Sequence, residues 1–92
     1  MAERTIHFDN AREAQDVTGT RGEYLPPLEQ AFKVAAVSRD LWLKLDGDAA
    51  AVAAAGAFVD GLLRARNAGM SLNPHAVAYA RQAYAEGRGA EV

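Results

Sequence analysis

The chain has no cysteine among its 92 residues, so neither a disulfide bond nor a thiolate metal site can stabilise it. It also lacks a long apolar run. The longest stretch without Asp, Glu, Lys, Arg or His, residues 49–59, is far shorter than the roughly 20 residues that a membrane-spanning helix needs. The first ten residues, MAERTIHFDN, carry charges at Glu3 and Arg4 and are not typical of a secretory signal. These absences favour a cytoplasmic protein that has no membrane partner.

Positive charge is not in excess, and large apolar side chains are few. The net charge of −2 argues against a general nucleic-acid-binding surface, which would need a basic stripe to displace counterions from phosphates. Half of the residues are hydrophobic, but 21 of the 92 are alanine, which contributes much less on burial than leucine or phenylalanine. Because a chain of this length is near the lower limit for a self-sufficient core, we expect it to associate with another chain.

The segment LPPLEQAFKVAAVSRDLWLKLDGD has residues that commonly start and end a helix. Pro26 and Pro27 suit the first turn, and Gly47 suits the position just past the last turn. We therefore predict a helix over residues 27–46. At 100° per residue its polar side chains fall in one narrow arc, while its apolar side chains cover more than half of the circumference. Such a helix must be covered on two sides.

Two further helices are predicted in the second half of the chain. Asp48 is a natural N-cap for a helix over residues 48–68, and Asn73 caps a helix over residues 74–86 that Gly87 ends. The short connections between the helices favour antiparallel neighbours in a bundle.

The first 25 residues look irregular by comparison. The tetrapeptide TIHF could form a short edge strand and DNAREAQDV could form two helical turns, but the glycines of TGTRGE interrupt whatever precedes them. We therefore predict an all-α fold, a small three-helix bundle preceded by an irregular N-terminal arm. The arm covers residues 1–25, the three-helix body residues 26–87 and a frayed tail residues 88–92.

The segment DAAAVAAAGAFVDGLL places Ala53, Ala57 and Gly61 four residues apart on one helix face. Small side chains let a neighbouring helix approach closer than the usual distance of about 8–10 Å. Alanine is also the best helix former, but a glycine in a helix interior costs about 1 kcal/mol relative to alanine. Gly56 and Gly61 therefore indicate a steric reason for their presence, and the neighbour is either another helix of the chain or a second copy.

Arginine and tryptophan supply the other candidate interface residues. Arg39 lies on the apolar side of the first predicted helix, three residues before Trp42. Its guanidinium must pair with an acid such as Asp60, stack on a ring or meet a partner. Both residue types often anchor interfaces. The predicted partner interface consists of Arg39, Trp42, Ala53, Ala57, Gly61 and Arg64.

A helix-turn-helix with Gly56 in its turn is an alternative interpretation of the same segment. The apolar framework positions fit, but Phe58 and Val59 stand where polar side chains would reach base edges. The residues left to contact DNA are Arg64, Arg66 and Asn67.

Catalytic and ligand signatures are weak. Neither His7 nor His75 has a second ligand or a nucleophile at a diagnostic spacing, and a Ser71–His75 pair lacks an orienting acid. The sequence DGD at 46–48 lacks the later oxygen ligands of a calcium loop. We therefore predict no enzyme, no cofactor and no metal site.

The leading functional prediction is a non-enzymatic helical protein–protein interaction module, acting as a homo-oligomer or as a small accessory subunit of a larger assembly. One alternative is a small helix-turn-helix-like DNA-binding regulator. Another is a small inhibitor or antitoxin-like protein that masks a partner protein. The expected partner is a protein or a second copy, and nucleic acid is less favoured.

Overall fold

The computed structural model describes residues 2–19, 21–39 and 41–86. Within these ranges an antiparallel sheet packs against helices, so the fold is α/β and the predicted all-α three-helix bundle with an irregular arm is wrong. The predicted tail, residues 88–92, lies outside the described residues. The strands are β1 (Ala2–His7), β2 (Ala35–Arg39) and β3 (Trp42–Gly47), and the helices are α1 (Ala11–Thr18), α2 (Leu25–Phe32), α3 (Ala49–Asn67) and α4 (Pro74–Ala85).

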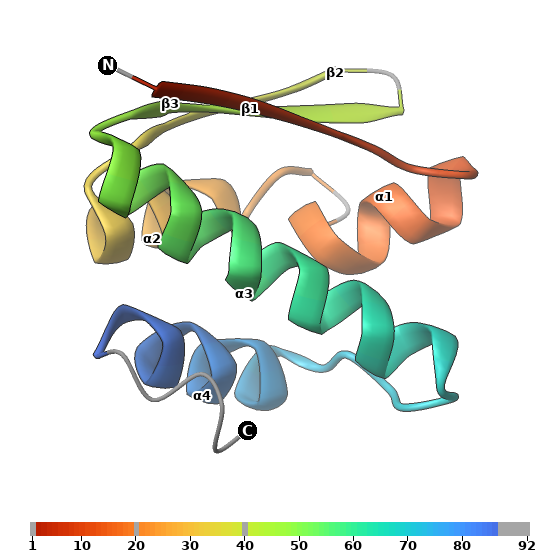
Figure 1. Cartoon of the computed structure of the whole chain (residues 1–92). Coiled ribbons are helices and arrows are strands. Elements are labelled where there is room, and N and C mark those ends of the chain that lie inside the picture. Colours follow the sequence, from red (N-terminus) through yellow and green to blue (C-terminus); the bar gives the residue numbers. More distant parts are fainter. Residues whose placement is uncertain (1, 20, 40, 87–92) are drawn as a thin grey trace.

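The helices and the sheet form layers. The strands pair in the order β1-β3-β2, and both pairs are antiparallel. Figure 1 shows the helices on one side of this sheet, with α4 on the side of α3 that points away from the strands. Helix α3 is therefore covered on two sides, whereas the other face of the sheet carries no helix of the described residues.

The predicted helix over residues 27–46 is wrong beyond its first part. Helix α2 ends at Phe32 because Lys33 adopts a left-handed conformation with a φ of 58°, and the chain then forms the β2–β3 hairpin. Leu43 and Leu45 are fully buried while the residues on either side of them are half-buried, which is the two-residue repeat of a strand. At a helical spacing the same side chains spread around the circumference, and we interpreted this spread as a helix covered on two sides.

The two helices predicted in the second half of the chain are confirmed as α3 and α4. The N-cap of α3 is Asp48, whose side chain makes no capping hydrogen bond. The N-cap of α4 is Asn73, whose side-chain oxygen accepts a hydrogen bond from the backbone nitrogen of Ala76 at 2.8 Å. No helix in the described part of the chain is long and apolar enough to cross a membrane.

Residues 2–18 belong to the folded layers and do not form an irregular arm. Strand β1 pairs with β3 along its whole length and places Ile6 opposite Leu43. Helix α1 packs against α3, and its N-cap is Asn10, whose side chain accepts a hydrogen bond from the backbone nitrogen of Glu13 at 2.8 Å. The short strand is stable because pairing and burial against remote elements outweigh a weak local pattern.

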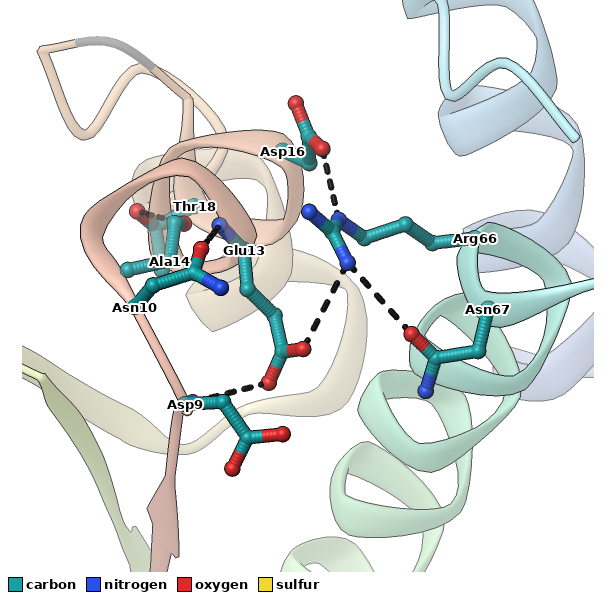
Figure 2. Close-up of polar contacts among 8 residues, drawn as sticks. All are labelled: Asp9, Asn10, Glu13, Ala14, Asp16, Thr18, Arg66 and Asn67. Carbon is teal, nitrogen blue, oxygen red and sulfur yellow. Dashed lines mark hydrogen bonds and ion pairs between the residues drawn. The ribbon is translucent and has the colours of Figure 1, made fainter. Parts of the chain in front are cut away.

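A polar cluster joins this N-terminal segment to the end of α3 (Figure 2). Arg66 donates from Nε to Oδ2 of Asp16 at 2.7 Å, and its Nη1 lies 3.5 Å from Oε2 of Glu13 and 3.4 Å from the side-chain oxygen of Asn67. The other carboxylate oxygen of Glu13 accepts the backbone N–H of Asp9 at 3.1 Å. Glu13 is only 6 % exposed, so Arg66 forms an ion pair with a buried carboxylate.

Both glycines inside α3 lie beneath a side chain from another element of the chain. A Cβ at Gly56 would collide with the guanidinium of Arg4 on β1, and a Cβ at Gly61 would lie 2.5 Å from the hydroxyl oxygen of Tyr84 on α4. Arg4 reaches over the helix to form an ion pair with Asp60 at 2.8 Å. The steric reason that we expected for the two glycines is therefore a contact within the chain at both positions.

The close approach at Gly61 leads to a prediction about stability. We expect the change in the free energy of unfolding caused by Gly61→Ala to be more stabilising by about 1 kcal/mol in a Tyr84→Phe background than in the wild type. Removing the hydroxyl relieves the overpacking, while the gain in helix propensity stays the same. The four free energies of unfolding, measured in urea, give this coupling. Additive effects of the two substitutions would show that the Tyr84 hydroxyl does not constrain the position.

The Arg66 cluster leads to a second prediction. Arg66→Met is expected to lower the free energy of unfolding by about 1–3 kcal/mol, because it leaves the buried Glu13 carboxylate without its cation. Arg64→Met is the matched control, since Arg64 is exposed on the same helix and makes no ion pair within the described residues. Equal urea denaturation midpoints for the two variants would contradict this role of the cluster.

Candidate functional site

The face of the sheet that points away from the helices is formed by alternate residues of each strand. Burial alternates along β2 and most of β3, and the buried Leu43 and Leu45 of β3 belong to the core. On β1, the buried Ile6 also belongs to the core, and Arg4 is on the same side because it contacts Gly56 and Asp60 of α3. The outward residues make three rows across the sheet, which are His7–Trp42–Arg39, Thr5–Lys44–Val37 and Glu3–Asp46–Ala35. We call these nine residues the open face.

The open face contains apolar side chains that water reaches. Val37 is 43 % exposed, and Trp42, the only tryptophan of the chain, is half-buried on the central strand. A single exposed apolar residue needs no explanation. A tryptophan on an uncovered sheet face, with arginine as its cross-strand neighbour, has the composition that marks the anchoring residues of protein interfaces.

The charge of the open face changes sign along the strands. One end carries Glu3 and Asp46, and the other carries Arg39 and His7. Lys44 lies in the central row and pairs with Glu3 at 3.3 Å and with Asp46 at 3.8 Å, which leaves one net negative charge at the acidic end. Arg39 makes no hydrogen bond or ion pair through its side chain within the described residues. The face is therefore electrically polar, and its positive end has no counter-charge among these residues.

Two of the six predicted interface residues lie on the open face. Arg39 and Trp42 are directly opposite each other in the β2–β3 hairpin. Asp60, which we considered as the acid that pairs with Arg39, instead pairs with Arg4 on the side of the sheet that faces α3.

The other four predicted interface residues lie on α3. Ala53 and Ala57 are exposed, whereas Gly61 and Arg64 line a hollow between α3 and α4. Because α4 lies on the side of α3 opposite to the sheet (Figure 1), the six residues do not form one continuous surface.

The three residues considered for DNA contact, Arg64, Arg66 and Asn67, also lie in different environments. Arg66 and Asn67 belong to the polar cluster with α1, where carboxylates already bind the guanidinium. Helix α3 continues through Gly56 without a turn.

The remaining members of the open face were not predicted from the sequence. Val37, Lys44 and Asp46 fell within a predicted helix, and Glu3 fell within a predicted arm. The signal that could have found them is the alternation in WLKLDG. Leu43 and Leu45 are apolar, whereas the residues that alternate with them, Trp42, Lys44 and Asp46, are amphipathic or charged. A two-residue period would have placed the charged residues together on one face.

The open face offers apolar contact area together with charged groups of both signs. His7 lies on this face, while His75 is exposed in the first turn of α4. In the parts of the chain that the structure describes, no three His, Cys, Asp or Glu side chains are grouped so that they could hold a metal ion. Apolar contact together with complementary charge is the usual basis of recognition between proteins.

Comparison with known proteins gives no relative from which a role could be transferred. No family model, no curated protein and no solved structure matches the chain.

Proposed function

We propose that this protein is a non-enzymatic protein–protein interaction module that forms a homodimer through the open face. The observation that supports this most is the reversal of charge along an uncovered sheet face that has Trp42 at one end and Val37 near its middle. A surface of this kind is complementary to a second copy of itself. A two-fold interface requires such self-complementarity.

The charge pattern selects one arrangement of the two copies. A two-fold axis that lies in the interface, perpendicular to the strands and along the central row, places the acidic end of one copy on the Trp42 row of the other. Asp46 then meets the second copy's Trp42, next to its Arg39. An axis parallel to the strands would instead place acid on acid and base on base, which is unfavourable.

The central row adds little cost to this arrangement. Lys44 of the two copies would lie near each other, but each lysine is already paired with Glu3 and Asp46 of its own chain. Val37 of each copy meets its counterpart in the same row and loses its exposed apolar area. Burial of Val37 favours association, and the pairing of each Lys44 within its own chain limits the repulsion between the two lysines.

The size of the face limits the affinity. Three strands spaced about 4.8 Å apart and about 20 Å long span roughly 300 Å² per copy, which is smaller than a standard specific interface. We therefore expect a reversible dimer with a Kd of about 10–100 μM rather than an obligate one. The proposed compartment is the cytoplasm, which a chain without cysteine suits.

Charge reversal tests both the dimer and its geometry. Arg39→Glu and Asp46→Lys should each weaken self-association by about tenfold or more, because each variant sets like charges against each other at two equivalent places. A mixture of the two variants should form a heterodimer of near wild-type affinity, since both charge pairs are then restored. Sedimentation velocity over about 5–500 μM protein measures these affinities.

The single tryptophan provides an independent readout and a control. Emission from Trp42 should shift to shorter wavelength as the wild type associates, because the ring loses water. Arg21→Glu changes the same charge at an exposed loop position outside the open face and should leave the affinity unchanged. A wild type that stays monomeric over the whole range, or a mixture that associates no better than its components, would refute the proposed homodimer.

A further inference from the structure

A hollow lies between α3 and α4, on the side of α3 opposite to the open face. Its volume is about 560 Å³, which is within the range of roughly 300–1,000 Å³ found for small-molecule sites. Helix α3 contributes Gly61 and Arg64, the α3–α4 connection contributes Met70 and Ser71, and α4 contributes Tyr79. Three separate segments therefore converge on one concave surface.

The walls of the hollow are mainly apolar, and part of them is unusually exposed. Met70 is 62 % exposed and Tyr79 is 63 % exposed, and both line this hollow. Leu62 and Ala80, which are buried, form part of its lining. A ligand with an apolar body would remove water from the two exposed side chains without needing to open the core.

The polar side chains that line the hollow are hydrogen-bond donors that have no partner among the described residues. Among the described residues, the side chains of Arg64, Ser71, Tyr79 and Tyr84 make no hydrogen bond or ion pair. Arg64 is exposed. Of the described residues that line the hollow, Arg64 supplies the only positive charge and none is a carboxylate residue. A guanidinium presents donors that match the two oxygens of a carboxylate.

The geometry points to a binding site for a small carboxylate with an aromatic or branched aliphatic body. The body lies against Met70 and Tyr79, and the carboxylate accepts hydrogen bonds from Arg64 at the rim. The charge of Arg64, which no described residue of the lining neutralises, favours an anion over a neutral or cationic ligand of the same shape. This site shares no residue with the open face, so it does not depend on the proposed dimer.

A titration with 4-phenylbutyrate and its neutral amide tests the site. In ¹H–¹⁵N spectra of the intact chain, the carboxylate should shift the amide signals of residues that line the hollow, with a Kd of about 1 mM. The neutral amide should bind about tenfold more weakly, because it lacks the charge that Arg64 recognises. Arg64→Gln should weaken binding of the carboxylate to that same level and leave binding of the neutral amide unchanged.

Two further variants serve as controls. Arg21→Gln removes an exposed arginine from the α1–α2 connection, which does not line this hollow, and should leave the affinity for both probes unchanged. Ala76→Leu projects a larger side chain into the hollow and should reduce the affinity for both probes by about tenfold or more, with an unchanged far-ultraviolet circular dichroism spectrum.

Two results would overturn the assignment. If the signals of the lining residues do not move in about 20 mM phenylbutyrate, the hollow is not a site for this class of ligand. If the carboxylate and the amide bind equally well, or if Arg64→Gln has no more effect than Arg21→Gln, then Arg64 does not select an anion.

Discussion

The packing of α3 against the central strand β3 is the contact on which the remaining structure depends. The interface between α3 and β3 is fully buried from solvent, since no surface is exposed at Leu43 and Leu45 of β3 or at Ala55 and Val59 of α3. The hairpin partner β2 and the N-terminal strand β1 both pair with β3, and α1, α2 and α4 all pack on α3. Every other element is therefore positioned by one of these two.

A core with few large side chains works here because the elements approach closely. Alanine and glycine on α3 let Arg4 cross the helix at Gly56 and let the ring of Tyr84 lie over Gly61. The same small set of elements also leaves surfaces uncovered. One sheet cannot be covered on both faces by helices that all lie on one side, so Trp42 and Val37 remain partly in water, and the short α4 leaves a hollow beside α3.

Four arginines divide according to their partners. Arg4 and Arg66 bind carboxylates on other elements, and Arg66 neutralises a buried glutamate. Arg39 and Arg64 make no ion pair within the described residues and each borders apolar surface. The first pair stabilises the fold, whereas the second pair is available to a partner. This division supports placing the two proposed contacts at the open face and at the α3–α4 hollow.

The sequence by itself determined the elements whose signals are local. Asn73 with Pro74 marks the start of α4, and the alanine-rich run after Asp48 forms α3, because capping and helix propensity act within a few residues. Arg39 and Trp42 were also predicted to be partner residues, from their residue types and from their placement on a helix that the structure replaces with strands, and this stays a prediction. Tertiary structure decided the strands, because β1 and the β2–β3 hairpin are short, and their stability comes from pairing with each other and from packing on α3, which lies later in the chain. It also decided which charges share a face, since that depends on the register between strands.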